Sequence, residues 1–219
     1  MYWTPRAKDG SLGAPRVALH EDGTELMAGE YWDFDAKVWT ETDASGDADA
    51  HGMSVGPVDW DDDGDIDLLI GCTDGRIFLR RNVGGSGGPR FTVQNEKVKY
   101  GRRSLYVRSG DATPVAADWN GDGLFDIVSG SKMGGVIVWL NVGERGKPAF
   151  APPRQLLDEV EGDPSSNAPG LRTQVHVTDY DGDGDADLVV GDYRRIDNKP
   201  HGLVWLVRRE KAESVAGQK

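Results

Sequence analysis

Apolar residues in this chain fall into short runs that are bounded by Gly, Pro, Asn or Asp. Residues 57–91 carry the runs PVDW, DLLIG, RIFLR and RF, and residues 114–151 repeat this order as PVAADW, DIVSG, GVIVWL and AFA. Short segments rich in Val, Ile, Leu and aromatic residues between such turn signals are typical of β-strands. The one helical candidate, 154–162, allows two turns at most. The pattern therefore predicts an all-β fold.

These runs belong to an internal repeat. A shift of 59 residues carries Asp59 onto Asp118 and Phe91 onto Phe150, with many identities between them and no gap. A further shift of 61 carries Asp118 onto Asp179, and this third copy is altered after Gly191 by DYRRIDNKPHG. Residues 21–39 resemble a fainter copy. Just before them, Ala18 and His20 stand where the other copies carry Asp or Asn. We expect this degenerate copy to bind no ion.

Units of about 60 residues with three or four strands each suggest the blades of a β-propeller. We expect about four blades, which either close a ring or form a partial propeller completed by oligomerisation or by further sequence. The predicted parts of this one propeller domain are 1–50 as a degenerate first blade with a clasp strand, 51–110, 111–172 and 173–209 as blades with acidic loops, and 210–219 as a polar tail.

The net charge of −12 is concentrated rather than spread. Of the 37 acidic residues, 14 lie in the three stretches 59–67, 118–126 and 179–187, so the remainder of the chain is close to neutral. Carboxylates this close repel one another unless a cation neutralises them. This acidity gives no support to nucleic-acid binding, and no apolar run approaches the length of a membrane span.

The three stretches share the pattern D-x-[DN]-x-D-G-x-x-D followed by an apolar strand. Ca²⁺ takes six to eight oxygen ligands in a flexible geometry, and Gly at position 6 lets the chain reverse. We expect side-chain oxygens at positions 1, 3, 5 and 9 and the carbonyl at position 7 to bind about three Ca²⁺ ions. The predicted ligands are Asp59, Asp61, Asp63, Asp65, Asp67, Asp118, Asn120, Asp122, Leu124, Asp126, Asp179, Asp181, Asp183, Asp185 and Asp187.

An EF-hand, a magnesium site and an ion-free turn each fit these loops less well. An EF-hand needs a Glu at position 12 and flanking helices, but position 12 is Ile70, Ser129 or Val190 and the flanks are strand-like. Mg²⁺ demands near-octahedral geometry and releases its water reluctantly. Acidic turns without an ion leave the threefold recurrence of the same spacing unexplained.

The segments DWDDDGDIDLLIG, DWNGDGLFDIVSG and DYDGDGDADLVVG resemble the FG-GAP/VCBS repeat family, which forms the blades of integrin α-subunit propellers and of many bacterial surface proteins. The match covers 55–207 well and 16–40 faintly. The resemblance implies Ca²⁺ loops between the first two strands of each blade, on the face opposite the usual ligand face and therefore structural. Related propellers usually have seven blades, whereas this chain has three clear units and a degenerate one. Four blades can close a ring, and because the last unit lacks an outermost strand, the N-terminal MYWTP could supply it and close the ring.

We expect a non-enzymatic module for extracellular recognition or adhesion, with a glycan or protein ligand and an extracellular, cell-surface or periplasmic location. The alternatives are an assembly domain completed by self-association and a polysaccharide-acting lyase or hydrolase. The chain shows no signal peptide, which we interpret as a mature form or a fragment. Cys72 is expected to be a small buried residue. Candidate ligand contacts are Trp3, Tyr31, Trp32 and the Arg- and Tyr-containing segment 100–111.

Overall fold

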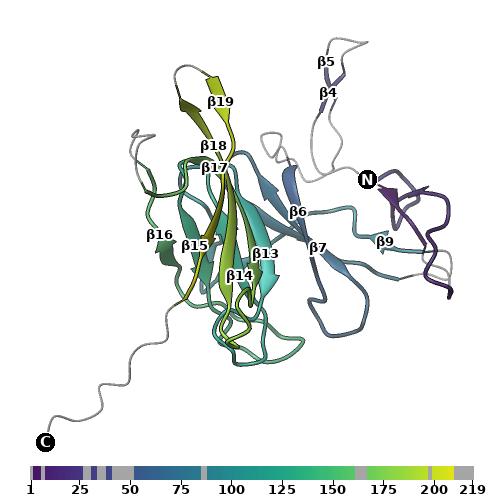
Figure 1. Ribbon diagram of the computed structural model, residues 1–219. Coiled ribbons are helices and arrows are strands. Elements are labelled where there is room, and N and C mark those ends of the chain that lie inside the picture. The colour runs from purple at the N-terminus through teal and green to yellow at the C-terminus, as the bar shows by residue number, and fades with distance from the viewer. Residues whose placement is uncertain are drawn as a thin grey trace, which may run out of the picture.

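The computed structural model describes residues 2–5, 8–26, 31–33, 38–40, 52–84, 88–160, 167–196 and 199–209. Every regular element in these ranges is a β-strand (Figure 1), so the all-β prediction is confirmed. The helical candidate 154–162 contains a strand instead, β16 (Arg154–Leu157). Among the described residues there is no helix with the length and apolar character needed to cross a membrane.

The first complete sheet is antiparallel, with the strand order β10–β8–β7–β6. Its strands are β6 (Gly52–Val58), β7 (Asp67–Cys72), β8 (Ile77–Arg80) and β10 (Glu96–Lys97). Both β7 and β8 are buried along their whole length. Strands covered on both faces are apolar throughout rather than alternating, which explains the continuous runs in the sequence. Cys72 is buried, as predicted.

The second sheet repeats this arrangement in the order β13–β14–β15–β16. Its other strands are β13 (Thr113–Ala117), β14 (Asp126–Gly130) and β15 (Val136–Trp139). A short hairpin of β11 (Lys99–Tyr100) and β12 (Arg103–Ser104) lies in the connection from the first sheet. This connection contributes the buried side chains of Leu105 and Val107 to the core.

The third sheet pairs β18 with both β17 and β20. Its strands are β17 (Leu171–Thr178), β18 (Asp187–Ile196) and β20 (Val204–Val207). The altered segment of the third repeat extends β18 into a hairpin with β19 (Lys199–His201). Within the described ranges no fourth strand lies along β20, as the missing outer strand in the sequence predicts.

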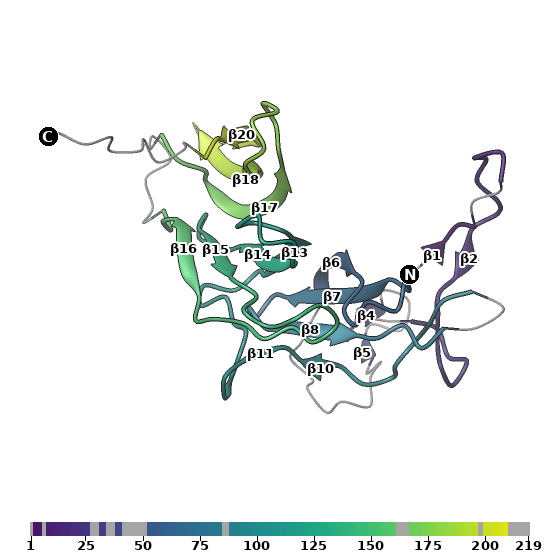
Figure 2. The same ribbon diagram turned by 90° about the horizontal axis from the view of Figure 1, so that it is seen from below.

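The three sheets stack in chain order (Figure 2). The first and second sheets meet through Leu69, Ile77, Leu79, Ile127 and Trp139. The second and third sheets meet through Val128, Val136, Val138, Val175, Leu188 and Val190. Each sheet thus has a leading face, turned toward the next sheet in the chain, and a trailing face turned toward the previous one. This is the packing of successive blades in a propeller, here as a partial one.

Two glycines allow this close stacking. A Cβ at Gly71 would overlap the carbonyl oxygen of Ala112, and a Cβ at Gly130 would overlap that of Thr173. Neither glycine has a positive φ. Glycine is therefore required at these positions because the first strand of the next sheet approaches the backbone, not because of a special dihedral angle.

The N-terminal region covers the trailing face of the first sheet. Ala18, Leu26 and Phe91 close a buried cluster on this face. The strands here are β1 (Tyr2–Trp3), β2 (Arg16–Val17), β3 (Leu19–His20), β4 (Tyr31–Asp33), β5 (Val38–Thr40) and β9 (Arg90–Phe91). β3 pairs in parallel with β9, and β1 pairs with β2. In this structure β1 is therefore not the outer strand of the third sheet.

Candidate metal-binding loops

The three acidic stretches form equivalent loops. Residues 59–66 connect β6 to β7, residues 118–125 connect β13 to β14, and residues 179–186 connect β17 to β18 (Figure 1). Each loop therefore joins the first two strands of its sheet, the position that the resemblance implies. The following strand starts at position 9 of the motif, where the chain turns from acidic to apolar.

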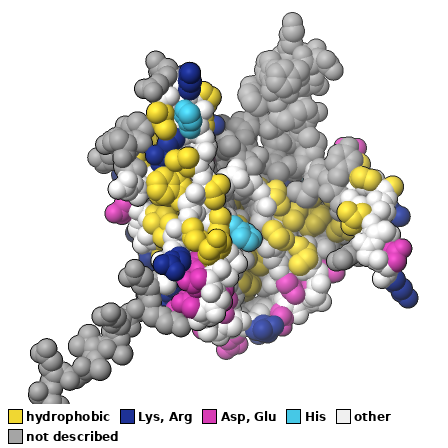
Figure 3. All heavy atoms as spheres, in the orientation of Figure 1, with side chains coloured by type: hydrophobic (Ala, Val, Ile, Leu, Met, Phe, Trp, Pro, Cys, Tyr) yellow, Lys and Arg dark blue, Asp and Glu magenta, His cyan; other side chains and the backbone are white. Residues whose placement is uncertain are grey.

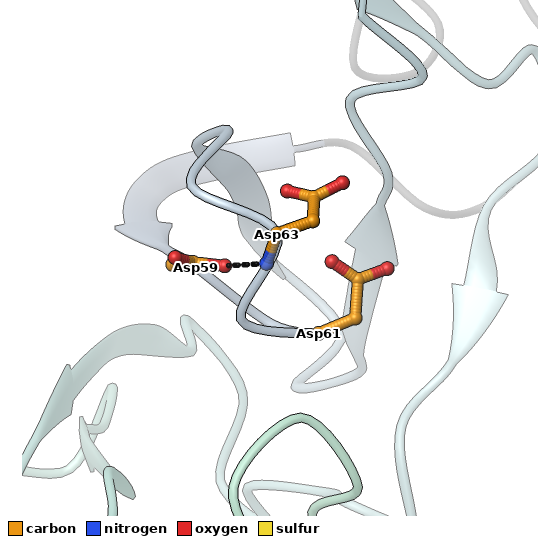
Figure 4. Close-up of side chains that lie close together, drawn as sticks. All are labelled: Asp59, Asp61 and Asp63. Carbon is orange, nitrogen blue, oxygen red and sulfur yellow. Dashed lines mark hydrogen bonds between the residues drawn. The ribbon is translucent and has the colours of Figure 1, made fainter.

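The first aspartate organises each loop through backbone hydrogen bonds. The Asp59 carboxylate accepts the N–H of Asp63 at 3.1 Å (Figure 4). It also accepts the N–H of Gly64 at 3.1 Å. Asp118 accepts the N–H of Gly123 at 2.8 Å, and Asp179 accepts that of Gly184 at 3.1 Å. The loop thus folds around position 1, and glycine at position 6 brings the donor within reach.

Two of the loops gather carboxylates closely enough to share one ion. Ligand oxygens of Asp59, Asp61 and Asp63 lie within 4.8 Å of one another, and so do those of Asp179, Asp181 and Asp187. Oxygens at 2.3–2.6 Å from a Ca²⁺ ion span at most about 5 Å across it. Hard, anionic oxygens are also the donors that Ca²⁺ prefers, so these residues fit the ion.

The second loop is less acidic and is linked by its own side chains. Asn120 donates from Nδ2 to Asp122 at 2.8 Å and accepts the Asp122 N–H on Oδ1 at 3.1 Å. At position 7 the amides of Asp65, Leu124 and Asp185 each donate to the position-5 carboxylate, at 2.8, 2.9 and 2.9 Å. The Asp122 N–H also donates to Asp118 at 3.1 Å, so hydrogen bonds connect positions 1, 3 and 5 of this loop, of which two carry a carboxylate.

The aspartate at position 9 links the loop to the third strand of its sheet. Asp67 accepts the N–H groups of Trp60 at 3.0 Å and Asn82 at 2.6 Å, one on each oxygen. Asp126 repeats this with Trp119 at 3.0 Å and Asn141 at 2.7 Å. Asp187 does so with Tyr180 at 3.1 Å and Arg209 at 2.8 Å. The spacing in the sequence predicted a metal ligand at position 9, but it did not predict that this carboxylate also links the loop to the end of the third strand.

Burial raises the pKa of Asp67 and of Asp126 above 3.8, although the two N–H donors to each carboxylate oppose this shift. Repulsion from Asp61 and from Asp122 adds to the increase. A divalent cation in the loop would oppose both effects, because it favours the charged carboxylate. The electrostatics of the loops therefore suit a bound cation.

Arginine side chains contact position 3 in two of the three loops. Arg81 Nη1 lies 2.9 Å from Asp61, and Arg208 Nη1 lies 3.2 Å from Asp181. Both residues follow the third strand of their sheets, where the second repeat has Leu140 next to a loop with the neutral Asn120. Aligning the repeats past the loops would have revealed this pairing of Arg with Asp.

The NVG motif of the repeats also has a structural role that sequence reasoning left unassigned. Asn82 Oδ1 accepts the N–H groups of Gly84 and Arg90, and Asn141 Oδ1 accepts those of Gly143 and Ala149, all at 3.0–3.1 Å. The backbone N–H of each asparagine donates in turn to the aspartate at position 9. The motif therefore connects the acidic loop to the outer segment of its repeat.

In the first two repeats the aromatic residue at position 2 of the motif packs against the next repeat. The Trp60 ring centroid lies 5.6 Å from that of Phe125 and 5.9 Å from that of Phe150. The Arg209 guanidinium stacks over Trp119, 5.5 Å from the ring centroid. Trp60 is thus buried in the core between the first two repeats.

A cleft of about 830 Å³ lies beside the first loop, between the first and second repeats. Its lining includes the cations Arg81, Lys97, Lys99 and Lys147, with Glu96 among them. Three of the candidate ligand contacts, Trp3, Tyr31 and Trp32, have side chains that lie outside the part of the chain whose side chains the structure describes. Segment 100–111 places Leu105 and Val107 in the core and leaves Tyr106 half exposed.

Comparison with protein families supports the resemblance to FG-GAP repeats. The model of the FG-GAP-like repeat matches residues 59–129 and 118–190, two adjacent copies that together cover most of the chain. No curated protein matches the chain significantly. The loops, the strand order and the family match agree, and the chain belongs to the FG-GAP-like repeat family.

Proposed function

We propose that this protein is a calcium-binding β-propeller module for extracellular recognition or adhesion, in which Ca²⁺ stabilises the blades. The observation that carries the proposal is the convergence of carboxylate oxygens within 4.8 Å in the stretches 59–67 and 179–187. The same motif in loop 118–125, with one neutral ligand, supports a weaker third site. We propose a binding role rather than a catalytic one.

The ligands would come from positions 1, 3, 5, 7 and 9 of each loop. Asp67, Asp126 and Asp187 would then have two roles, as metal ligands and as the link from the loop to the third strand. Both roles are compatible because a carboxylate oxygen that accepts one N–H retains a second lone pair. A bound ion would supply the positive charge that close carboxylates lack. It would thereby fix the connection between the first two strands of each sheet.

Exposed loops of this kind suit millimolar Ca²⁺ rather than cytosolic concentrations. With a Kd of about 0.1–1 mM, typical of extracellular modules, about 1 mM Ca²⁺ adds roughly 0.4–1.4 kcal/mol of stability per site. Three sites would add roughly 1–4 kcal/mol, a sizeable part of a domain's usual 5–15 kcal/mol. We therefore propose an extracellular, cell-surface or periplasmic location.

The cleft beside the first loop is the surface that suits a ligand best. Its cations contrast with the acidity of the whole chain, so a polyanionic glycan or an acidic protein segment would be favoured there. This site lies at the junction of two repeats, whose relative position the ions would help to fix.

Calorimetric titration of the chelator-treated protein with Ca²⁺ tests the metal sites. We expect about three ions per chain and a higher melting temperature, with Mg²⁺ much less effective. Asp63→Asn and Asp183→Asn keep an oxygen for the local hydrogen bond and should each remove one site. Asp158→Asn, at an exposed position outside the loops, is the control. Identical melting curves with calcium and with chelator would refute the proposal.

A further inference from the structure

The leading face of the third sheet is exposed, although the same positions are buried in the other two sheets. Ile77, Val136 and Val204 each pair with the glycine at the equivalent position of the neighbouring strand, Gly71, Gly130 and Gly191. Ile77 is 1% exposed and Val136 is 0% exposed, but Val204 is 78% exposed.

Two further positions on this face are also exposed in the third sheet and buried in the sheets that another sheet covers. Leu79 and Val138 are 0% and 1% exposed, whereas Leu206 at the equivalent register is 41% exposed. At position 2 of the loops, Trp60 is 7% exposed and Tyr180 is 63% exposed. Figure 3 shows hydrophobic side chains gathered over the strands of the third sheet. Contiguous exposed apolar surface of this kind marks interaction sites.

Gly191 is a second, independent sign that a backbone docks on this face. The nearest atom to a Cβ built at Gly191 is the Gln174 carbonyl oxygen at 4.0 Å, which is ordinary contact. The φ of Gly191 is not positive. Nothing in the described residues therefore requires glycine here, whereas Gly71 and Gly130 are required by the first strand of the following sheet.

The two interfaces within the chain indicate what kind of surface fits. On the leading faces of the first two sheets, the first strand of another repeat crosses the glycine. In a second copy of this chain, the trailing face of the first sheet is already covered by Ala18, Leu26 and Phe91. The segment that precedes the degenerate N-terminal copy is solvent-exposed instead. Residues 8–16 are all exposed, and Leu12 is 72% exposed.

We propose that the leading face of the third sheet binds a second copy of this chain, through the segment 11–17 that precedes and includes β2. This segment would cross Gly191 as residues 112–114 cross Gly71. Two such contacts, related by a twofold axis, join the ends of both chains and complete a ring, so the assembly closes as a dimer. The proposal does not depend on calcium binding.

The molar mass of the full chain in solution, followed by light scattering from about 1 to about 200 µM, tests the proposal. We expect a dimer of twice 23.8 kDa at the upper end, both in calcium and in chelator. Val204→Lys should raise the dimer Kd about tenfold or more. Val142→Lys, at a 68% exposed position of the second repeat, is the matched control and should leave the Kd unchanged.

Leu12→Lys should weaken the dimer as Val204→Lys does. A mixture of these two variants can form a dimer with one intact contact, so it should dimerise more strongly than either variant alone. A monomer at every concentration overturns the proposal, whether the face is then covered by the same chain or by another protein. A dimer that tolerates either substitution also overturns it. Circular dichroism at low concentration shows that each variant is folded.

Discussion

Arg81 donates from Nη1 to Asp61 at 2.9 Å, so the first acidic loop has a cationic neighbour within the protein itself. Arg81 also pairs with Glu96 at 2.9 Å, and both contacts are partly exposed. The third loop has the equivalent pair of Arg208 and Asp181. Where the second repeat has Leu140, position 3 of the motif is the neutral Asn120, and the stretch 118–126 holds three carboxylates against six and five in the other two. An Arg therefore follows the third strand in the two repeats in which position 3 is an Asp, and it offsets part of the negative charge of those loops.

Arg81→Leu is expected to raise the Ca²⁺ affinity of the loop 59–66 by about twofold to fivefold, the range of an exposed ion pair. The guanidinium occupies Asp61 and repels an incoming cation, and leucine does neither. Calorimetric titration measures the change, and Arg81→Lys, which keeps the charge, should stay close to the wild type. A weaker site in Arg81→Leu would contradict this account.

Asp126→Asn is expected to lower the free energy of unfolding by about 1–3 kcal/mol, even in chelator. Asp126 is fully buried and accepts two backbone N–H groups. Asparagine accepts only one of them and turns its own NH₂ toward the other. Urea unfolding in chelator measures the loss. If the loss appeared only in calcium, Asp126 would act as a metal ligand, and its hydrogen bonds to Trp119 and Asn141 would not contribute to stability.

Trp60→Ala is expected to destabilise the protein by about 3–5 kcal/mol, because the ring fills the interface between the first two repeats. Val83→Ala, at a position that is 51% exposed, should change stability by less than about 0.5 kcal/mol. Denaturant melts compare the two variants. A similar, small effect of both substitutions would show that the repeats do not depend on this contact.

Position 4 of the acidic motif has a positive φ in all three repeats, at Asp62 (61°), Gly121 (78°) and Gly182 (77°). Gly121→Ala should cost about 1 kcal/mol from backbone strain alone, since no atom lies within 4 Å of the added Cβ. Asp62→Gly should be neutral or stabilising by up to about 1 kcal/mol, although it loses the exposed contact with Arg145. Thermal melts at fixed calcium test both, and a stabilising Gly121→Ala would contradict the assigned strain.

Acid should unfold the third sheet through Asp192. Burial would raise the pKa of this carboxyl, but the hydrogen bonds from the N–H groups of Gly170, Leu203, Trp205 and Arg194 outweigh burial and hold the pKa below 3.8. A lowered pKa in the folded state contributes stability at pH values above about 3.8, and this stability is lost as the pH falls through the folded pKa.

Asp192→Asn is therefore expected to be less stable than the wild type at pH 7, by about 3–5 kcal/mol as for a broken buried ion pair. The difference should start to shrink below about pH 3.8, where the carboxyl of the unfolded wild type binds a proton, and should shrink further as the pH falls through the lower pKa of the folded state. Urea midpoints across this pH range measure it. A difference that stays constant with pH would exclude the ionised form of Asp192 as its cause.

The sequence by itself determined the strand-rich fold, the repeat and the position of the acidic loops. These features are local: runs of apolar residues, turn residues and a nine-residue motif that recurs at shifts of 59 and 61. The sequence also predicted that the last repeat lacks an outer strand, because the NVG motif and the following Pro and Phe of the first two repeats are absent after LVWLV.

Only the tertiary structure decided what depends on neighbouring repeats. Asp67 and Asp126 look like their fellow ligands in the sequence, but each bridges a loop to an amide 15 residues later. Val204 looks like any core valine, and it is exposed because no sheet follows it among the described residues. A strand's pattern encodes that a face is apolar, whereas what covers that face depends on contacts between segments far apart in the chain.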